Sequence, residues 1–273
     1  MRYQWTAFVE RFRCALLGHL RNRLSLFLVY AFVPTWLTLV RVCGYEGAAR
    51  LHIATIEVRA VVPAMSVAQV TNAVTAVALI AGFMMFMAAF KAREMDRRLV
   101  LAGYPRSQLV LANVGALLVV AAVLACYTTV LLRLFFPVHQ FGHLLVAVFA
   151  AGCAYGGIGL LLGTLVRDEL EGFFVVLMLS LIDVGLQNPV IKVAELPGLL
   201  KALPSYGATQ SALAAAVTRA DPGPYPLLAL AWCGATVTLA LLVFHVRTRG
   251  YWPAAAASRP AGSRDDTPAV ADT

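Results

Sequence analysis

The sequence predicts an all-α polytopic membrane protein with six transmembrane helices. Hydrophobic residues make up 60% of the 273 residues and charged residues only 13%, whereas soluble domains hold roughly 45–50% and about 25%. Several uncharged runs reach the length of about 20 residues that is needed to cross a bilayer. The charged residues gather between these runs, and this alternation predicts membrane spans that are joined by polar loops.

An amphipathic interfacial helix is predicted over residues 1–23, ahead of the first span. Aromatic and leucine side chains recur there at near-helical spacing, and five arginines stand between them. Such a helix lies in the membrane interface, with its aromatic residues toward the lipid and its arginines at the phosphates. A soluble basic tail is the alternative, and the interleaved aromatic residues disfavour it.

Six runs with little or no charge predict the spans. Pro34 is expected to kink the first span, and four glycines in the fourth, at positions 152, 156, 159 and 163, predict close approach to a neighbouring helix. The predicted spans are 24–43, 67–90, 109–132, 144–166, 172–190 and 225–246. Residues 44–59 are predicted to form a polar loop, residues 191–224 short interfacial or re-entrant helices, and residues 247–273 a disordered tail.

The distribution of positive charge predicts the orientation in the membrane. Fifteen of the 22 Lys and Arg residues lie in the N-terminal helix, in residues 91–108, in the turn after the fourth span and in the tail. Loops that carry excess Lys and Arg stay on the cytoplasmic side. The chain is therefore expected to be a multi-pass protein of the cell (plasma) membrane with both termini in the cytoplasm. The same rule explains the net charge of +8 without a nucleic-acid partner.

Motifs for catalysis and metal binding are missing from the sequence. No Gly-Lys dipeptide occurs, so a P-loop for ATP hydrolysis cannot form, and the HExxH and GxSxG motifs are absent. The five cysteines show no CxxC spacing. His139 and His143 are four residues apart, but Pro137 and Gly142 disfavour a regular helix there. We therefore expect no catalytic residues, no metal site and no cofactor bound by this chain.

Asp183 is the carboxylate that lies inside a predicted span. A charged side chain in a membrane is costly unless it faces protein, water or a partner, so such a residue suggests a function. It could line a substrate pathway or bind protons. Alternatively, it lies near the outer end of its span, where Gln187 and Lys192 follow and water reaches it. The sequence leaves both interpretations open.

The interior charge is concentrated in residues 91–108, KAREMDRRLVLAGYPRSQ. This segment predicts a short helix at one membrane surface, with an apolar patch at Leu99–Leu101. Gly103 and Pro105 are expected to end it and turn the chain back to the membrane. On spacing alone, it is either an ordinary basic loop or a docking helix, whose apolar patch fits a groove and whose arginines meet an acidic rim.

Three segments carry a resemblance to one known family. They are RNRLSLFLVYAFVPTW, KAREMDRRLVLAGYPRSQL and LPGLLKALPSYGATQSA. The first resembles the basic interfacial helix that leads into a proline-containing first span in the ABC-2-type permeases, the membrane subunits of ABC exporters. The second is similar to the cytoplasmic coupling helix of that family, although Arg97-Arg98 replaces a frequent Gly-Thr. The third resembles its extracellular re-entrant region before the last span.

The resemblance implies a permease that moves a substrate out of the cell, possible cargoes being a hydrophobic drug, a lipid or a peptide. Two such subunits, identical or homologous, would enclose the path, and separate ABC ATPase chains would bind below and hold ATP and Mg. The residues implied at the ATPase contact are Arg93, Glu94, Arg97, Arg98, Tyr104, Pro105 and Arg106. A proton-coupled secondary transporter and a non-transporting membrane assembly protein remain alternatives.

Overall fold

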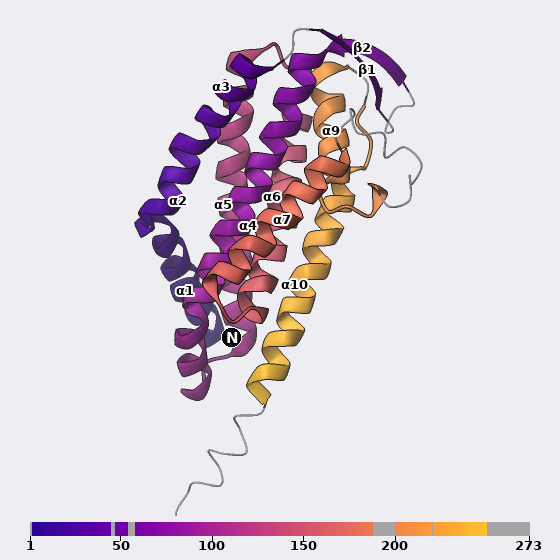
Figure 1. Cartoon of the computed structure of the whole chain (residues 1–273). Coiled ribbons are helices and arrows are strands. Elements are labelled where there is room, and N and C mark those ends of the chain that lie inside the picture. The colour runs from indigo at the N-terminus through magenta and orange to yellow at the C-terminus, as the bar shows by residue number, and fades with distance from the viewer. Residues whose placement is uncertain (1, 45–46, 54–57, 188–199, 220, 250–273) are drawn as a thin grey trace, which may run out of the picture.

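The computed structural model describes residues 2–44, 47–53, 58–187, 200–219 and 221–249 (Figure 1). These residues form an elongated helical bundle with a small β-hairpin at one end. Five helices in the described part are long and apolar enough to cross a membrane: Ser25–Cys43, Ala64–Leu101, Ser107–Phe135, Phe141–Leu165 and Pro226–Val246. Residues 172–187 of the predicted fifth span are also helical, but their helix is not one of these five, so the expected total of six spans is not confirmed.

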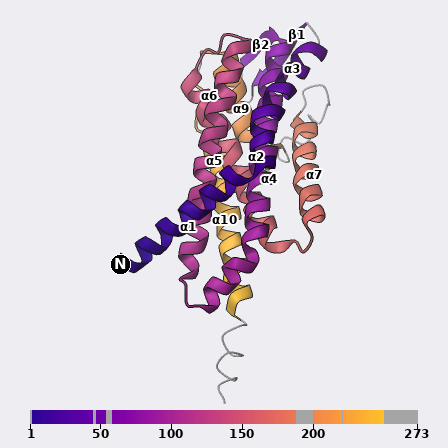
Figure 2. The ribbon, with the colours of Figure 1, turned by 90° about the vertical axis from the view of Figure 1, so that its left-hand side faces the viewer.

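The elements follow one another in simple up-and-down order. They are α1 (Arg2–Arg21), α2 (Arg23–Phe27), η1 (Leu28–Phe32), α3 (Val33–Cys43), β1 (Ala48–Ile53), β2 (Val58–Pro63), α4 (Ala64–Leu101), α5 (Arg106–Phe135), α6 (Phe141–Leu165), α7 (Glu169–Gln187), α9 (Tyr206–Val217) and α10 (Pro226–Arg249). Figure 2 shows α1 running obliquely across the lower half of the bundle, with its N-terminal end standing out to one side.

The first span is interrupted where the sequence predicted a kink. The π-helical turn η1 ends at Phe32, and Pro34 occupies the first turn of α3. Proline lacks the N–H that would bond to the preceding turn, and a π-helical turn accommodates the gap in the hydrogen-bond ladder. The first span therefore consists of two α-helical parts joined by one wider turn.

The separate coupling helix that we expected is not present. Residues 91–101 form the last turns of α4, which is one helix of 38 residues from Ala64 to Leu101. The physical reason is the lack of a helix-breaking residue between Gly82 and Gly103 in a segment rich in Ala, Met and Arg. The helix ends at Leu101, and Gly103 turns the chain as predicted: its φ of +86° suits glycine, and the N–H of Tyr104 donates to the oxygen of Leu99 at 2.9 Å.

Two other segments differ from the sequence-based prediction. The expected polar loop over residues 44–59 contains β1, which pairs with β2 in an antiparallel register from Ala48↔Pro63 to Ile53↔Val58. Residues 247–249 of the expected tail belong to α10. Residues 250–273 of the tail, together with residues 188–199 between the fifth span and α9, lie outside the described residues.

The helix α6 lies at the centre of the bundle and packs against α4, α5, α9 and α10. Its glycines permit this, as predicted. A Cβ atom on Gly159 would overlap the backbone oxygen of Gly82 and stand 3.0 Å from the backbone nitrogen of Phe86, both in α4. A Cβ atom on Gly156 would meet Leu117 of α5. Small residues therefore bring α6 into backbone contact with α4.

The two ends of the bundle differ in composition. The N-terminal helix, the α4–α5 turn, the α6–α7 turn and the end of α10 lie toward one end, whereas the hairpin and α9 lie at the other (Figure 1). The helix α9 is 12 residues long, too short to cross a bilayer, and it is buried against α6, α4 and α10. The segments that carry the excess of positive charge are thus gathered at one end.

Replacing Gly159 by alanine is expected to destabilise the protein by about 1–3 kcal/mol, because the new methyl group would force α4 and α6 apart. The matched control is Gly234→Ala in α10, where a Cβ atom meets nothing within 4 Å. It should not destabilise the protein and should raise stability by up to about 1 kcal/mol, because alanine is the better helix former. Thermal unfolding of both variants in detergent measures the difference. Equal Tm values for the two variants would contradict the close α4–α6 contact.

Candidate functional site

The exposed end of α4 presents a small mixed surface beyond the uncharged part of the helix. It consists of Glu94, Met95, Arg97, Arg98 and Leu101, which we call the coupling surface. Arg98 Nε lies 3.4 Å from Glu94 Oε1, but both side chains are largely exposed. Such an exposed pair contributes only about 0.3–0.5 kcal/mol to the stability of the protein. The two side chains are therefore held weakly and can rearrange when a partner binds.

Two large apolar side chains of the coupling surface are exposed. Met95 and Leu101 are each 58% exposed, although they lie past Lys91, where the uncharged run has ended. Of the apolar patch predicted at Leu99–Leu101, only Leu101 is exposed, and its two neighbours are partly buried. An apolar pair between arginines is suited to a protein groove with an acidic rim.

Arg93 points into the protein rather than outward. Its Nη2 donates to the backbone oxygen of Gly163 at 2.7 Å and also to that of Val166, at the C-terminal end of α6. The guanidinium carbon lies 4.9 Å from the centre of the Phe90 ring. A cation is favourable there because the last carbonyls of a helix have no helical partner and carry partial negative charge. Arg93 thus joins α4 to α6.

The turn after α4 is attached to the N-terminal helix. The hydroxyl of Tyr104 donates to the backbone oxygen of Ala7 in α1. Pro105 directly precedes α5, with φ −67° and ψ 120°, and it sets the angle at which the chain re-enters the bundle. Arg106 is the first residue of α5, and its side chain lies outside the described part.

Asp96 is a buried member of the same segment that sequence reasoning did not single out. Arg11 Nη2 of α1 donates to Asp96 Oδ1 at 2.6 Å, and the two side chains are 13% and 8% exposed. The sequence offered two signals, the arginines of the amphipathic N-terminal helix and one aspartate among the basic residues of 91–108. Spacing could not show which arginine pairs with it. This ion pair and the Tyr104 contact fix α1 to the end of α4.

Asp183 is buried in a polar network rather than reached by water. It is 1% exposed, so the interpretation of a water-exposed position is wrong. Its carboxylate accepts from the Tyr155 hydroxyl at 2.6 Å, from the backbone N–H of Ser205 at 3.2 Å and from Gln187 Nε2. Gln187 also donates to Ser205 Oγ at 2.8 Å. The network joins α7 to α6 and to the segment that precedes α9.

The predicted site residues therefore divide into two groups. Glu94, Arg97 and Arg98 share the coupling surface, whereas Asp183 lies in a different part of the bundle, where α6, α7 and the start of α9 meet. Throughout the described ranges, no three His, Cys, Asp or Glu residues gather in a way that could hold a metal ion. His139 Nδ1 lies 3.0 Å from the backbone oxygen of Ala216, which holds the α5–α6 turn on α9.

Breaking the Arg11–Asp96 pair on one side is expected to cost about 3–5 kcal/mol, because a buried charge is left without its partner. Arg11→Gln and Asp96→Asn should each lower the Tm strongly, and the double variant should lower it by less than the sum, with a coupling energy of at least about 1 kcal/mol. The exposed pair offers a control: Glu94→Gln with Arg98→Gln should change stability little. Additive effects at Arg11 and Asp96 would contradict the contact.

Asp183→Asn is expected to lower the Tm, because an amide nitrogen would face donors that now meet a carboxylate. Tyr155→Phe removes one of these donors and should cost about 1.5–3 kcal/mol. Tyr127→Phe is a matched control, since that hydroxyl donates at 3.2 Å to Tyr30 on the exposed surface. If Asp183→Asn unfolds like the wild-type protein, the network does not stabilise the bundle.

Comparison with known proteins adds to these observations. A family model described as ABC-2 family transporter protein matches residues 49–243, which include α4 to α9 and most of α10. No curated protein matches the chain. The matched region contains the coupling surface, the Asp183 network and the glycine-rich α6. Since the match covers well over half of the sequence, the chain belongs to the ABC-2 transporter family.

Proposed function

We propose that the chain is the membrane permease of an ATP-driven exporter and that it uses an ABC ATPase on a separate chain. The coupling surface is the observation that carries this proposal. It exposes charge and apolar area at the end of a long helix, and the chain itself has no Gly-Lys dipeptide with which to build a P-loop. Membership of the ABC-2 family supports the same function.

The contacts around the coupling surface suit the transmission of force. A push on Arg97 or Arg98 acts on α4, which continues without a break into the bundle. Arg93 carries the displacement to the end of α6, and Asp96 carries it to α1 through Arg11. Closure of the ATPase would therefore move α1, α4 and α6 together, rather than one loop.

The partner surface can be described by its chemistry. Arg97 and Arg98 favour an acidic rim on the partner, and Met95 with Leu101 favours an apolar groove inside that rim.

Because an ABC ATPase acts as a pair, the chain would work as a dimer, with an identical or a homologous second permease. ATP and Mg would be held by the ATPase. Both termini would lie in the cytoplasm, below the plasma membrane, and the cargo would be a hydrophobic drug, a lipid or a peptide.

A proton-coupled secondary transporter is supported less well. Proton transport needs ionisable side chains that can be reached by water deep in several spans. Asp183 is a buried carboxylate of α7, and its oxygens already accept from Tyr155, Gln187 and Ser205. These contacts favour a structural role for Asp183 over proton carriage, and they leave the ATPase-driven permease as our proposal.

Charge reversal at the coupling surface tests the proposal. The wild-type chain, purified from its native membrane, is expected to bring with it an ATPase that contains a P-loop. Arg97→Glu with Arg98→Glu should reduce the amount of co-purified ATPase at least about tenfold, since repulsion from an acidic rim costs several kcal/mol. Quantitative mass spectrometry of the purified complex measures the ratio of ATPase to permease.

The control reverses two exposed arginines at the opposite end, Arg41→Glu with Arg133→Glu. It changes the net charge by the same amount and should leave the ratio unchanged. Absence of any ATPase from the wild-type preparation would contradict the proposed function. Retention of the ATPase by the Arg97–Arg98 variant would contradict the assigned surface and leave the function standing.

A further inference from the structure

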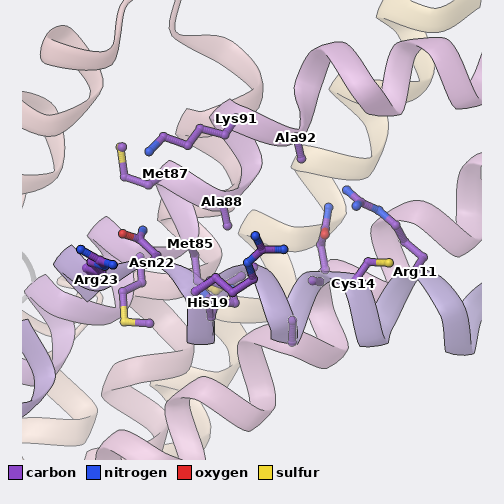
Figure 3. Close-up of a pocket in the computed structure, with 16 residues that line it drawn as sticks. Arg11, Cys14, His19, Asn22, Arg23, Met85, Met87, Ala88, Lys91 and Ala92 are labelled. Atoms are coloured by element: carbon purple, nitrogen blue, oxygen red, sulfur yellow. The ribbon is translucent and has the colours of Figure 1, made fainter. Parts of the chain in front are cut away.

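A pocket of about 570 Å³ lies between the N-terminal helices and the bundle (Figure 3). Its walls come from α1, α2, α4 and α5. Figure 3 shows Asn22, Arg23 and Lys91 toward one end of the pocket and Arg11 and Cys14 toward the other. The pocket is distinct from the coupling surface, because none of the five residues of that surface lines it.

The pocket is lined by cations and by no carboxylate. Arg21, Arg23 and Lys91 line it, all three side chains are exposed, and no acidic residue is among the lining residues. Within the described ranges, none of these three cations makes an ion pair. Arg11 also lines the pocket, but it is neutralised by Asp96. The uncompensated charge therefore favours an anionic ligand.

His19 provides a second and independent sign of a ligand. Its side chain lines the pocket, the residue is only 8% exposed, and its Nε2 atom has no hydrogen-bond partner among the described residues. Burial lowers the pKa of His19, so the imidazole is neutral at pH 7. A buried polar atom without a partner is uncommon in folded proteins and calls for an explanation such as a missing ligand or water.

The side of the pocket that α4 forms is apolar apart from Lys91. Met84, Met85 and Met87 come from α4, together with Ala88. Methionine side chains are flexible and adapt to irregular apolar ligands. The three free cations stand where the uncharged runs of the first two spans begin or end, since Arg23 precedes residues 24–40 and Lys91 follows residues 60–90. That boundary is the level at which lipid phosphates lie.

We propose that this pocket binds the phosphate-bearing headgroup of an anionic membrane lipid. Arg21, Arg23 and Lys91 bind the phosphate, and the acyl chains of the lipid extend along the uncharged parts of the first two spans. A free phosphate ion would satisfy the same cations, but their position at the ends of the uncharged runs favours a phosphate that a membrane lipid carries. The lipid is a bound component that holds α1 against α4, and this role depends on neither the ATPase partner nor the transported cargo.

Lipid preference of the purified full-length chain tests the proposal. Native mass spectrometry in a neutral detergent would follow binding of phosphatidylglycerol and of phosphatidylcholine over the same concentrations. The wild-type chain is expected to bind phosphatidylglycerol at least about tenfold more tightly, because each cation near an anionic lipid adds roughly a fivefold gain. Arg21→Gln, Arg23→Gln and Lys91→Gln together should abolish this preference.

The control replaces three exposed arginines at the opposite end by glutamine: Arg41, Arg133 and Arg219. It removes the same charge and should keep the preference. A triple pocket variant that retains the preference, or a control that loses it equally, would overturn the proposal. If the triple pocket variant does not fold, Lys91→Gln alone should still weaken phosphatidylglycerol binding about threefold or more, and wild-type affinity in that variant would overturn the proposal.

Two further readouts separate the lipid from other occupants. Inorganic phosphate at millimolar concentration should fail to displace phosphatidylglycerol, and complete displacement would identify a site for free anions instead. The same spectra report the oligomeric state. If the triple variant changed the fraction of dimer and not the lipid preference, the pocket would be a contact between two copies of the chain, and the lipid assignment would be wrong.

Discussion

The backbone contact between α4 and α6 is the constraint on which the rest of the structure depends. It exists because Gly159 of α6 meets Gly82 and Phe86 of α4 with no side chain between them. In a membrane, where lipid is as apolar as leucine, such close packing supplies much of the association that the hydrophobic effect supplies in water. With α6 at the centre, α5, α9 and α10 assemble around it, and the end of α4 takes a fixed position relative to the end of α6.

The same contact explains why the charged end of α4 is an ordered structure. Arg93 reaches the last carbonyls of α6 only because the two helices run side by side. Asp96, one turn further, is covered by α1 through Arg11. The residues of the same turns that face outward form the coupling surface. One helix end therefore serves both the internal packing of the bundle and the surface that we assign to a partner.

The sequence predicted the membrane class, the positions of most helices and the close approach at the glycines, because uncharged length and small-residue spacing are local signals. It did not predict that α4 continues past Lys91, because a change from apolar to charged residues marks the membrane boundary and not a helix end. The sequence also did not predict the Arg11–Asp96 pair or the burial of Asp183. Both depend on partners that are far away in the sequence, such as Tyr155, and spacing along one helix cannot identify them.

The continuity of α4 has a mechanical consequence. A helix of 38 residues is about 57 Å long at roughly 1.5 Å per residue, whereas the hydrocarbon core is only about 30 Å thick. The helix packs against α6 along much of its length, from Val77 beside Gly152 to Ala89 beside Gly163. A shift of its charged end would therefore carry the other end, next to β2 and α9, with it. A displacement at one face of the membrane would thus appear at the opposite face within a single element.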